Sequence, residues 1–209
     1  FMRLILASSS PRRREIFALL GLPFETIAPD FEETLSSHCP AEAEVLDFAL
    51  GKAQSVANDN PDAIVIGSDT MILIGGEKIG KPSGVENARQ ILRALSGKNH
   101  RILTSVALLD GTGGQGLRIV EEVSVKMRPF TDAEIERYLS FNESLDKAGA
   151  YSIQGEGGGL IESIRGDYLA AVGLPLKPIA GYLESRGISF PLDVENLYAE
   201  KSFRNWREF

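Results

Sequence analysis

Serines and arginines gather near the N-terminus, at the point where a short apolar run ends. Residues 3–7 predict a buried strand, which is followed by three serines at 8–10, by Pro11 and by three arginines at 12–14. Ser10 suits a helix N-cap, and Pro11 suits the first helical position. A helix N-terminus offers free backbone N–H groups and the positive end of the helix dipole, so this segment is suited to binding a phosphate. The alternative is an ordinary strand–helix turn with solvated arginines.

Two carboxylates follow where predicted strands meet loops. Glu33 lies in an acidic loop after a strand expected at 24–28. Asp69 follows the β-branched run at 63–67, which predicts a buried strand that ends at the polar residues 68–70, after which residues 71–74 are expected to continue extended. A carboxylate at the carboxyl end of a core strand in an α/β protein lies where ligands commonly bind.

Two lysines add positive charge to this set. Lys52 is expected near the middle of an amphipathic helix at 41–57, solvated in the ordinary case and a phosphate ligand if it is buried near a site. Lys81 follows a glycine hairpin at 75–76. Carboxylates that hold Mg²⁺ and activate water, with cations that neutralise a reacting phosphate, suit metal-assisted phosphoryl chemistry. The alternative for each residue is ordinary surface charge.

Other catalytic patterns are weaker. His38 and His100 have unremarkable surroundings in the sequence, so no Ser-His-Asp triad is indicated. Cys39 is the single cysteine, which excludes an intrachain disulfide and a cysteine-rich zinc site. A G-x-G-x-x-G pattern at 111–116 precedes a predicted strand rather than a helix, so we expect a hairpin there and no dinucleotide site.

The composition is that of an ordinary globular protein. The chain has 209 residues, 43% hydrophobic and 24% charged, with a net charge of −7. These values predict a single domain over residues 1–209, and the negative charge argues against a general nucleic-acid partner. Without a long apolar span or signal peptide, we expect a cytoplasmic protein with no membrane partner. Phe1 precedes Met2 and is interpreted as an added residue.

The hydrophobic periodicity predicts an α/β fold with one mixed, twisted sheet flanked by helices. Further strands are expected at 101–109, 117–127 and 160–164, and further helices at 11–20, 85–95, 131–141 and 175–187. Residues 146–159 predict a loop, and residues 190–209 have no firm pattern.

Seven short motifs occur in an order that points to a family. They are Ser8-Ser9-Ser10-Pro11-Arg12-Arg13, Asp30-Phe31-Glu32-Glu33, Gly67-Ser68-Asp69-Thr70, Gly80-Lys81-Pro82, His100-Arg101-Ile102-Leu103-Thr104, Tyr151-Ser152-Ile153-Gln154-Gly155 and Val172-Gly173-Leu174-Pro175-Leu176. Together they closely resemble the Maf family of nucleoside triphosphate pyrophosphatases, also called septum-formation-inhibitor-like proteins. The resemblance runs from about Leu4 to Gly187 and leaves the tail outside. Ser105 departs from the family pattern, which commonly has glycine there.

The resemblance implies hydrolysis of a nucleoside triphosphate between the α- and β-phosphates, giving a monophosphate and pyrophosphate. It implies a divalent metal cation, Mg²⁺ or Mn²⁺, and often a homodimer. It also implies a fold like the inosine triphosphate pyrophosphatases, with a cleft between two lobes. Carried onto this sequence, it makes Asp69 the base that activates water and, with Glu33, a metal ligand. Arg13, Lys52 and Lys81 become catalytic phosphate ligands.

Three positions separate subgroups of this family, and Arg12, Thr70 and Gln154 match the subgroup acting on dTTP and UTP rather than its sister acting on 7-methyl-GTP. With Ser8 and Ser10, they are the candidate substrate-binding residues. The Gln154 amide carries a donor and an acceptor and can pair with the edge of uracil or thymine, whereas the alternative is an ordinary loop glutamine. A second function remains open, that of a nucleotide-binding regulator of cell division and septum formation whose hydrolysis is incidental.

Overall fold

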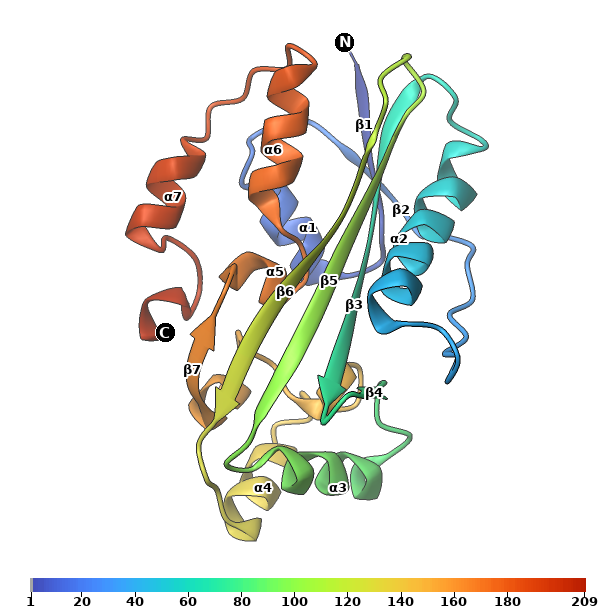
Figure 1. Cartoon of the computed structure of the whole chain (residues 1–209). Helices are drawn as coiled ribbons and strands as arrows, with labels where there is room; N and C mark the ends of the chain where they lie inside the picture. Colours follow the sequence, from blue (N-terminus) through green and yellow to red (C-terminus); the bar gives the residue numbers. More distant parts are fainter. Residues whose placement is uncertain (1) are drawn as a thin grey trace.

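A seven-stranded mixed sheet forms the centre of the molecule (Figure 1). The computed structural model describes residues 2–209, and Phe1 lies outside the described residues. The strands are β1 (Arg3–Ala7), β2 (Glu25–Ile27), β3 (Ala63–Ile74), β4 (Glu77–Ile79), β5 (Asn99–Asp110), β6 (Leu117–Met127) and β7 (Ile161–Arg165). Their order is β2-β1-β3-β5-β6-β7, and β4 pairs with β3. β1 is parallel to β2 and β3, and the other pairs are antiparallel.

Helices cover both faces of the sheet. They are α1 (Pro11–Ala18), α2 (Ala41–Ala57), α3 (Val85–Leu95), α4 (Asp132–Leu139), α5 (Tyr168–Val172), α6 (Leu176–Ser185) and α7 (Val194–Glu200), with short 3-10 turns η1 (Ala148–Ala150), η2 (Glu156–Leu160) and η3 (Trp206–Glu208). α2 packs on one face, where Ala49 and Ala53 join a cluster with Ile5 and Val65. The other helices contribute to a larger hydrophobic cluster on the opposite face.

Side chains along β3 alternate between these two faces, as the pleat of a strand requires. Ile64 and Ile66 join the larger cluster, whereas Val65 contacts the face covered by α2. By the same alternation Asp69 reaches a side chain of α2, and Thr70 reaches a side chain of α1 on the opposite face. Two neighbouring polar residues of one strand therefore form hydrogen bonds with two different helices.

Long strands join the two ends of the molecule. β3, β5 and β6 run through both ends, with α1, α2 and α6 around one end and α3 and α4 at the other (Figure 1). The predicted fold class, a mixed sheet flanked by helices, is confirmed. Two local predictions are also confirmed. α4 begins with a capping box, and the glycine pattern lies in the hairpin between β5 and β6.

The structure corrects the prediction for the strand that carries Asp69. β3 does not end at residues 68–70 but continues to Ile74, because β5 pairs with it from Ile64 to Leu73. Asp69 therefore lies inside a strand. The polar run resembles a strand end in the sequence, yet Ser68, Asp69 and Thr70 each hydrogen-bond to a neighbouring segment.

Two helices have no counterpart in the sequence prediction. α5 has only five residues, too few to show a helical period. α7 lies in the tail, where Asp193 caps it by accepting a hydrogen bond from the Asn196 backbone N–H.

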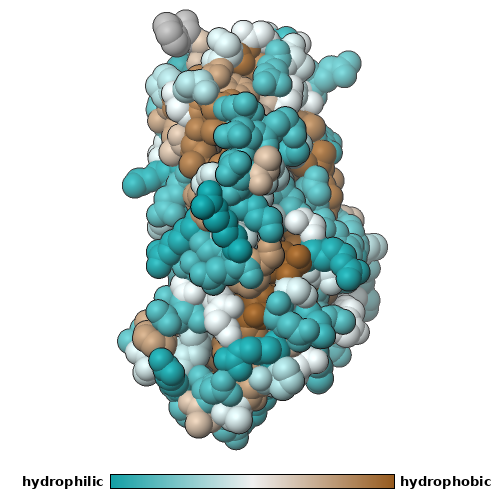
Figure 2. Space-filling model, turned by 90° about the vertical axis from the view of Figure 1, so that its left-hand side faces the viewer, coloured by the Kyte–Doolittle hydropathy of each residue, from teal (hydrophilic) through white to brown (hydrophobic). Residues whose placement is uncertain are grey.

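The surface of one side is mainly hydrophilic. Figure 2 shows the side that lies on the left in Figure 1, where hydrophobic residues form patches separated by hydrophilic ones. Within residues 2–209, the large hydrophobic side chains that are exposed are Leu35, Val85, Phe141 and Leu145. Within residues 2–209, no helix combines the length and the apolar character that crossing a membrane requires.

β3 and α2 approach each other closely at Gly67. A Cβ atom there would lie 2.2 Å from the Ala49 carbonyl oxygen and 2.8 Å from the Ala53 nitrogen. Both are backbone atoms of α2, so neither can turn aside as a side chain could. Glycine therefore allows the short distance between α2 and the strand, two residues before Asp69.

We expect Gly67→Ala to lower the free energy of unfolding by about 1–3 kcal/mol, the usual effect of overpacking a filled core. Gly181→Ala in α6 is the matched control, because a Cβ there has nothing within 4 Å and alanine favours a helix. Urea unfolding at neutral pH measures both variants. Equal stability of Gly67→Ala and the parent would contradict the close packing of β3 on α2.

Candidate active site

A cleft of about 900 Å³ lies beside the middle of β3. It is lined by the start of α1, the loops that follow β2 and β4, part of α2, and a segment within residues 143–155. Every candidate residue from the sequence lines it: Ser8, Ser10, Arg12, Arg13, Glu33, Lys52, Asp69, Thr70, Lys81 and Gln154. The fold brings the whole set together, while the role of each residue remains a prediction.

An unpaired stretch of β3 opens onto this cleft. On one side β5 pairs with β3 without a break, whereas on the other β1 pairs only with residues 63–67 and β4 only with residues 72–74. Asp69 and Thr70 lie in the gap between these two partners, so a ligand can approach them from the open edge. β1 ends at Ala7 opposite Gly67, and the chain then turns into α1, whose first residues line the same cleft.

The ammonium group of Lys52 is buried between two carboxylates. Its Nζ lies 2.5 Å from Asp69 Oδ1 and 2.5 Å from Glu33 Oε1. Lys52 and Asp69 are only 7% and 5% exposed, and a buried charge is costly unless it is paired. Of the two alternatives for Lys52, a solvated side chain or one buried near a site, the structure shows the buried one. An ammonium group has three N–H donors, which leaves one for a ligand.

The two carboxylates have pKa values shifted in opposite directions. Burial raises the pKa of Asp69 above its usual range, although the charges of Lys52 and Arg13 act against this. Burial also acts to raise the pKa of Glu33, but the hydrogen bond from Lys52 and the nearby positive charges outweigh it and hold that pKa below its usual range. Such a pair, with pKa values moved apart, is typical of sites that need one basic carboxylate and one that stays ionised.

Gly51 of α2 lets the loop that carries Glu33 lie against the helix. A Cβ atom at Gly51 would lie 2.1 Å from a ring carbon of Phe31, so the aromatic ring rests on the helix backbone. Phe31 also packs against Phe48 of α2, with ring centroids 6.0 Å apart. Because Phe31 precedes Glu33 by two residues, these contacts hold the acidic loop beside Lys52.

Two hydrogen bonds fix Arg13 and leave several of its donors unused. Nε donates to the Gly173 carbonyl at 2.8 Å, and Nη2 donates to Thr70 Oγ1 at 3.0 Å. Thr104 Oγ1 donates its only proton to the Ala170 carbonyl, so Thr70 is the donor in the 3.2 Å contact between the two hydroxyls. Burial lowers the pKa of Arg13, but a guanidinium remains charged. The remaining N–H groups of Arg13 suit an anionic ligand in the cleft.

The start of α1 has the predicted cap. Ser10 Oγ accepts a hydrogen bond from the Arg13 backbone N–H at 3.4 Å, and Pro11 occupies the first turn. Ser8 Oγ accepts from the Ser10 backbone N–H at 3.1 Å. Both hydroxyls act as acceptors in these bonds, so each retains an O–H donor that a phosphate oxygen could accept.

Arg12, Lys81 and Gln154 line the cleft, and their side chains hydrogen-bond to no other residue of the described chain. Burial lowers the pKa of Arg12, with the charge of Asp146 acting in the opposite direction. Gln154 is only 7% exposed, and a buried amide normally has partners within the protein. Its unused donor and acceptor are therefore suited to a bound molecule.

A divalent cation would find two protein carboxylates here. Lys52 uses one oxygen of Asp69 and one of Glu33, so the second oxygen of each remains available. Within residues 2–209, no group of three or more His, Cys, Asp and Glu side chains could hold a metal ion. Mg²⁺ is commonly bound by one or two carboxylates together with substrate phosphates, so these residues fit a cation that arrives with a nucleotide.

Tyr151 lines the cleft and contacts His100, a buried histidine of a family motif to which the sequence analysis gave no role. Tyr151 Oη lies 2.7 Å from His100 Nε2, and the two rings pack edge to face with centroids 5.6 Å apart. Burial lowers the pKa of His100 to about 4, so the imidazole is neutral. His100 therefore supports the wall of the cleft. The two residues are far apart in the sequence, and only the tertiary contact reveals their relation.

Comparisons with known proteins show sequence similarity to one family over most of the chain. The family model for Maf-like proteins matches residues 3–186. A dTTP/UTP pyrophosphatase of Dictyoglomus thermophilum is 43% identical over 187 residues, which cover 89% of this chain and 97% of that protein. One of Bacillus cereus is 39% identical over 192 residues, covering 92% and 97%. Among solved structures, the Staphylococcus aureus Ham1 protein aligns with 60% of this chain and 71% of its own at 17% identity, with a TM-score of 0.43.

The neutral, buried His100 predicts a pH dependence of stability. Its pKa falls from the ordinary 6.5 to about 4 on folding, so below about pH 6.5 the unfolded chain binds a proton that the native state does not. Stability therefore falls as the pH falls through this window, by up to about 3 kcal/mol in total. Urea unfolding at several pH values between about 7 and 4 measures this slope.

His100→Gln keeps a hydrogen-bonding group beside Tyr151 but cannot titrate, so we expect a shallower slope for this variant. His38→Gln is the matched control, because His38 is exposed. If His100→Gln and the parent lost stability equally on acidification, the proposed linkage to His100 would be wrong.

Proposed function

Because the chain belongs to the Maf family, we propose that it hydrolyses dTTP and UTP between the α- and β-phosphates, releasing a nucleoside monophosphate and pyrophosphate. Both relatives described above are named for activity on these two nucleotides. The observation that carries the proposal is the ion pairing of buried Lys52 with buried Asp69 and with the more exposed Glu33, beside the start of α1.

Asp69 is proposed as the base that activates the attacking water. Its Oδ1 accepts the hydrogen bond from Lys52, which fixes the carboxylate, and the remaining lone pairs of its two oxygens can accept a proton from water and bind a cation. Burial raises its pKa, and a general base is more effective when its pKa approaches the working pH. Lys52, held between Asp69 and Glu33, keeps this carboxylate oriented, and its third N–H is proposed to bind a phosphate oxygen.

The triphosphate is proposed to bind between the start of α1 and the loop after β4. Arg13 offers N–H donors that no protein group uses, and the hydroxyls of Ser8 and Ser10 lie beside the helix N-terminus. Lys81, in the loop after β4, also lines the cleft and is exposed to solvent. Fixed donors aimed at phosphate oxygens stabilise the negative charge that shifts between them during the reaction.

A divalent cation, Mg²⁺ or Mn²⁺, is proposed to be held by Asp69 and Glu33 together with the phosphates of the substrate. Such a cation supplies charge neutralisation at the reacting phosphate. The low pKa of Glu33 keeps this carboxylate ionised across the neutral range, as a metal ligand must be.

The nucleobase of the substrate is proposed to pair with Gln154. Uracil and thymine present a carbonyl acceptor next to the N3–H donor, which an amide can match with its own donor and acceptor. Cytosine has an amino group and an unprotonated N3 at these positions, so the same amide orientation would leave buried polar groups unpaired.

The purified protein, incubated with Mg²⁺ and a panel of UTP, dTTP, CTP, GTP and 7-methyl-GTP, tests this function directly. We expect metal-dependent release of pyrophosphate and monophosphate, fastest with UTP and dTTP. Release of orthophosphate and a diphosphate would contradict the assigned bond. Tight binding of nucleotide without turnover would favour a nucleotide-binding regulator over an enzyme.

Asp69→Asn is expected to fold and to lose about 10²–10⁴-fold in rate on UTP, because the amide cannot accept the proton of water. Asp62→Asn is the matched control, since Asp62 is an exposed partner of Arg3. Steady-state pyrophosphate release measures both rates, and circular dichroism checks the fold. Turnover of Asp69→Asn within about twofold of the parent would mean that Asp69 is not the base.

Gln154→Ala is expected to reduce the preference for UTP over CTP by about tenfold, the scale of one hydrogen bond. The ratio of kcat/KM for the two nucleotides is the measurement. Gln115→Ala, in the exposed hairpin between β5 and β6, provides the control. An equal loss on both nucleotides would show that Gln154 supports the loop instead of reading the base.

A further inference from the structure

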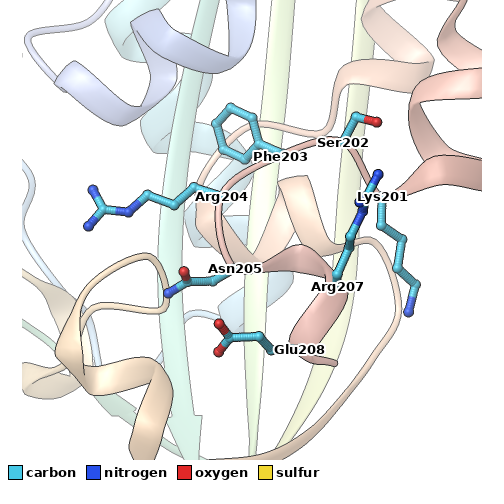
Figure 3. A pocket seen from close by; sticks show the side chains of 7 residues that line it. All are labelled: Lys201, Ser202, Phe203, Arg204, Asn205, Arg207 and Glu208. Carbon is cyan, nitrogen blue, oxygen red and sulfur yellow. The ribbon is translucent and has the colours of Figure 1, made fainter.

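The C-terminal segment, residues 190–209, reaches the cleft although it lies beyond the family match. That match ends at residue 186, yet Arg204 is one of the residues that line the cleft. Arg204 also borders a shallow hollow of about 510 Å³ on the segment itself, which is formed entirely by residues 201–208 (Figure 3). Arg204, which lies outside the matched region, therefore borders both the cleft and this hollow.

Aromatic packing anchors this segment to α5. The indole of Trp206 stacks on Tyr168, with ring centroids 5.3 Å apart and planes 13° from parallel. Tyr198 of α7 packs edge-on against the same indole at 4.9 Å, and its hydroxyl donates to Asp167 Oδ2 at 2.9 Å. Trp206 is buried, so the segment has a fixed place on the molecule.

Two hydrogen bonds fix the backbone at Arg204. Tyr168 Oη donates to the Arg204 carbonyl at 2.6 Å. Asn205 has a left-handed φ of 62°, which asparagine tolerates better than most residues, and its Nδ2 donates to the Ile153 carbonyl at 3.2 Å. Ile153 directly precedes Gln154. The segment is therefore fastened to the loop that carries the proposed base-reading amide.

The guanidinium of Arg204 has no partner in the described chain, unlike its neighbour Arg207. Arg207 Nε donates to the Glu200 carbonyl at 2.9 Å. Arg204 forms neither a side-chain hydrogen bond nor a salt bridge within residues 2–209, and it is exposed. Figure 3 shows its side chain extending away from those of Lys201 and Arg207. The backbone is held firmly while the charged end is left for a ligand.

We infer that Arg204 is a substrate-binding residue that contacts the nucleoside end of the pyrimidine nucleotide. This inference rests on the proposed function. Arg13, Lys52 and Lys81 supply the proposed phosphate end, whereas the Asn205 bond ties Arg204 to the Gln154 loop. A guanidinium can donate to the carbonyl oxygens of uracil or thymine and can stack on the face of the ring. The tail thus adds a cation to the base site.

Arg204→Ala, compared with Arg207→Ala, tests this inference in the full-length protein. Three quantities are measured for each: the KM and kcat for UTP, the dissociation constant of UMP by calorimetry, and the inhibition constant of inorganic tripolyphosphate. We expect Arg204→Ala to weaken UMP binding and raise the KM for UTP by about tenfold, the scale of one charged hydrogen bond. Inhibition by tripolyphosphate should stay unchanged, and Arg207→Ala should resemble the parent throughout.

UMP binding within about twofold of the parent would overturn the inference. An equal weakening of UMP and tripolyphosphate binding would also overturn it, because Arg204 would then act on the phosphates. The rate of the parent on UTP tests the proposed function separately, since UMP binding needs no turnover. If the parent hydrolyses UTP and Arg204→Ala does not differ from it, only the role of Arg204 fails.

Discussion

A buried lysine ammonium held between two carboxylates is the interaction on which the cleft depends. Lys52 comes from α2, Asp69 from β3 and Glu33 from the loop after β2, so three segments must meet at one nitrogen atom. An unpaired charge at this depth would be strongly unfavourable, and the trio therefore constrains all three segments at once. Gly67 and Gly51 make the meeting possible, because each removes a side chain where α2 is approached closely. The position of Asp69, the proposed general base, thus depends on the packing as much as on the sequence motif.

The open edge of β3 provides access to that trio. β1 and β4 occupy the same side of β3 but leave residues 68–71 without a strand partner on that side. Alternation along β3 sends Asp69 toward α2 and Thr70 toward Arg13. One short stretch of strand thereby contacts both the proposed water-activating group and the proposed phosphate-binding group. α5 and the residue after it also bond to the sheet, because the Ala170 carbonyl accepts a hydrogen bond from Thr104 and the Gly173 carbonyl accepts one from Ser68.

Much of the candidate site could be predicted from the sequence, since the residues that converge on the cleft stand in short motifs with recognisable local structure. The N-cap at Ser10 is a local feature, and the sequence predicts it directly. The position of Asp69 inside β3 could not be predicted, because the pairing of residues 64–73 with β5 is a tertiary contact that overrides the polar appearance of residues 68–70. The contact of His100 with Tyr151, and the approach of Arg204 to the cleft, likewise join residues far apart in the chain. Residues 190–209 bury few side chains, so their pattern carries little periodic signal.

The continuous pairing of β3, β5 and β6 also limits how this molecule can move. β5 pairs along most of its length with both neighbours, and these strands pass through the two ends without a flexible link. Hinge closure requires a few residues that can absorb large changes of φ and ψ, and an unbroken ladder of hydrogen bonds supplies none. β3, β5 and β6 therefore form one continuous support for both ends of the molecule. Most of the cleft lining lies outside this ladder, so we expect any adjustment to the proposed nucleotide in the side chains and in the loops around Glu33 and Gln154.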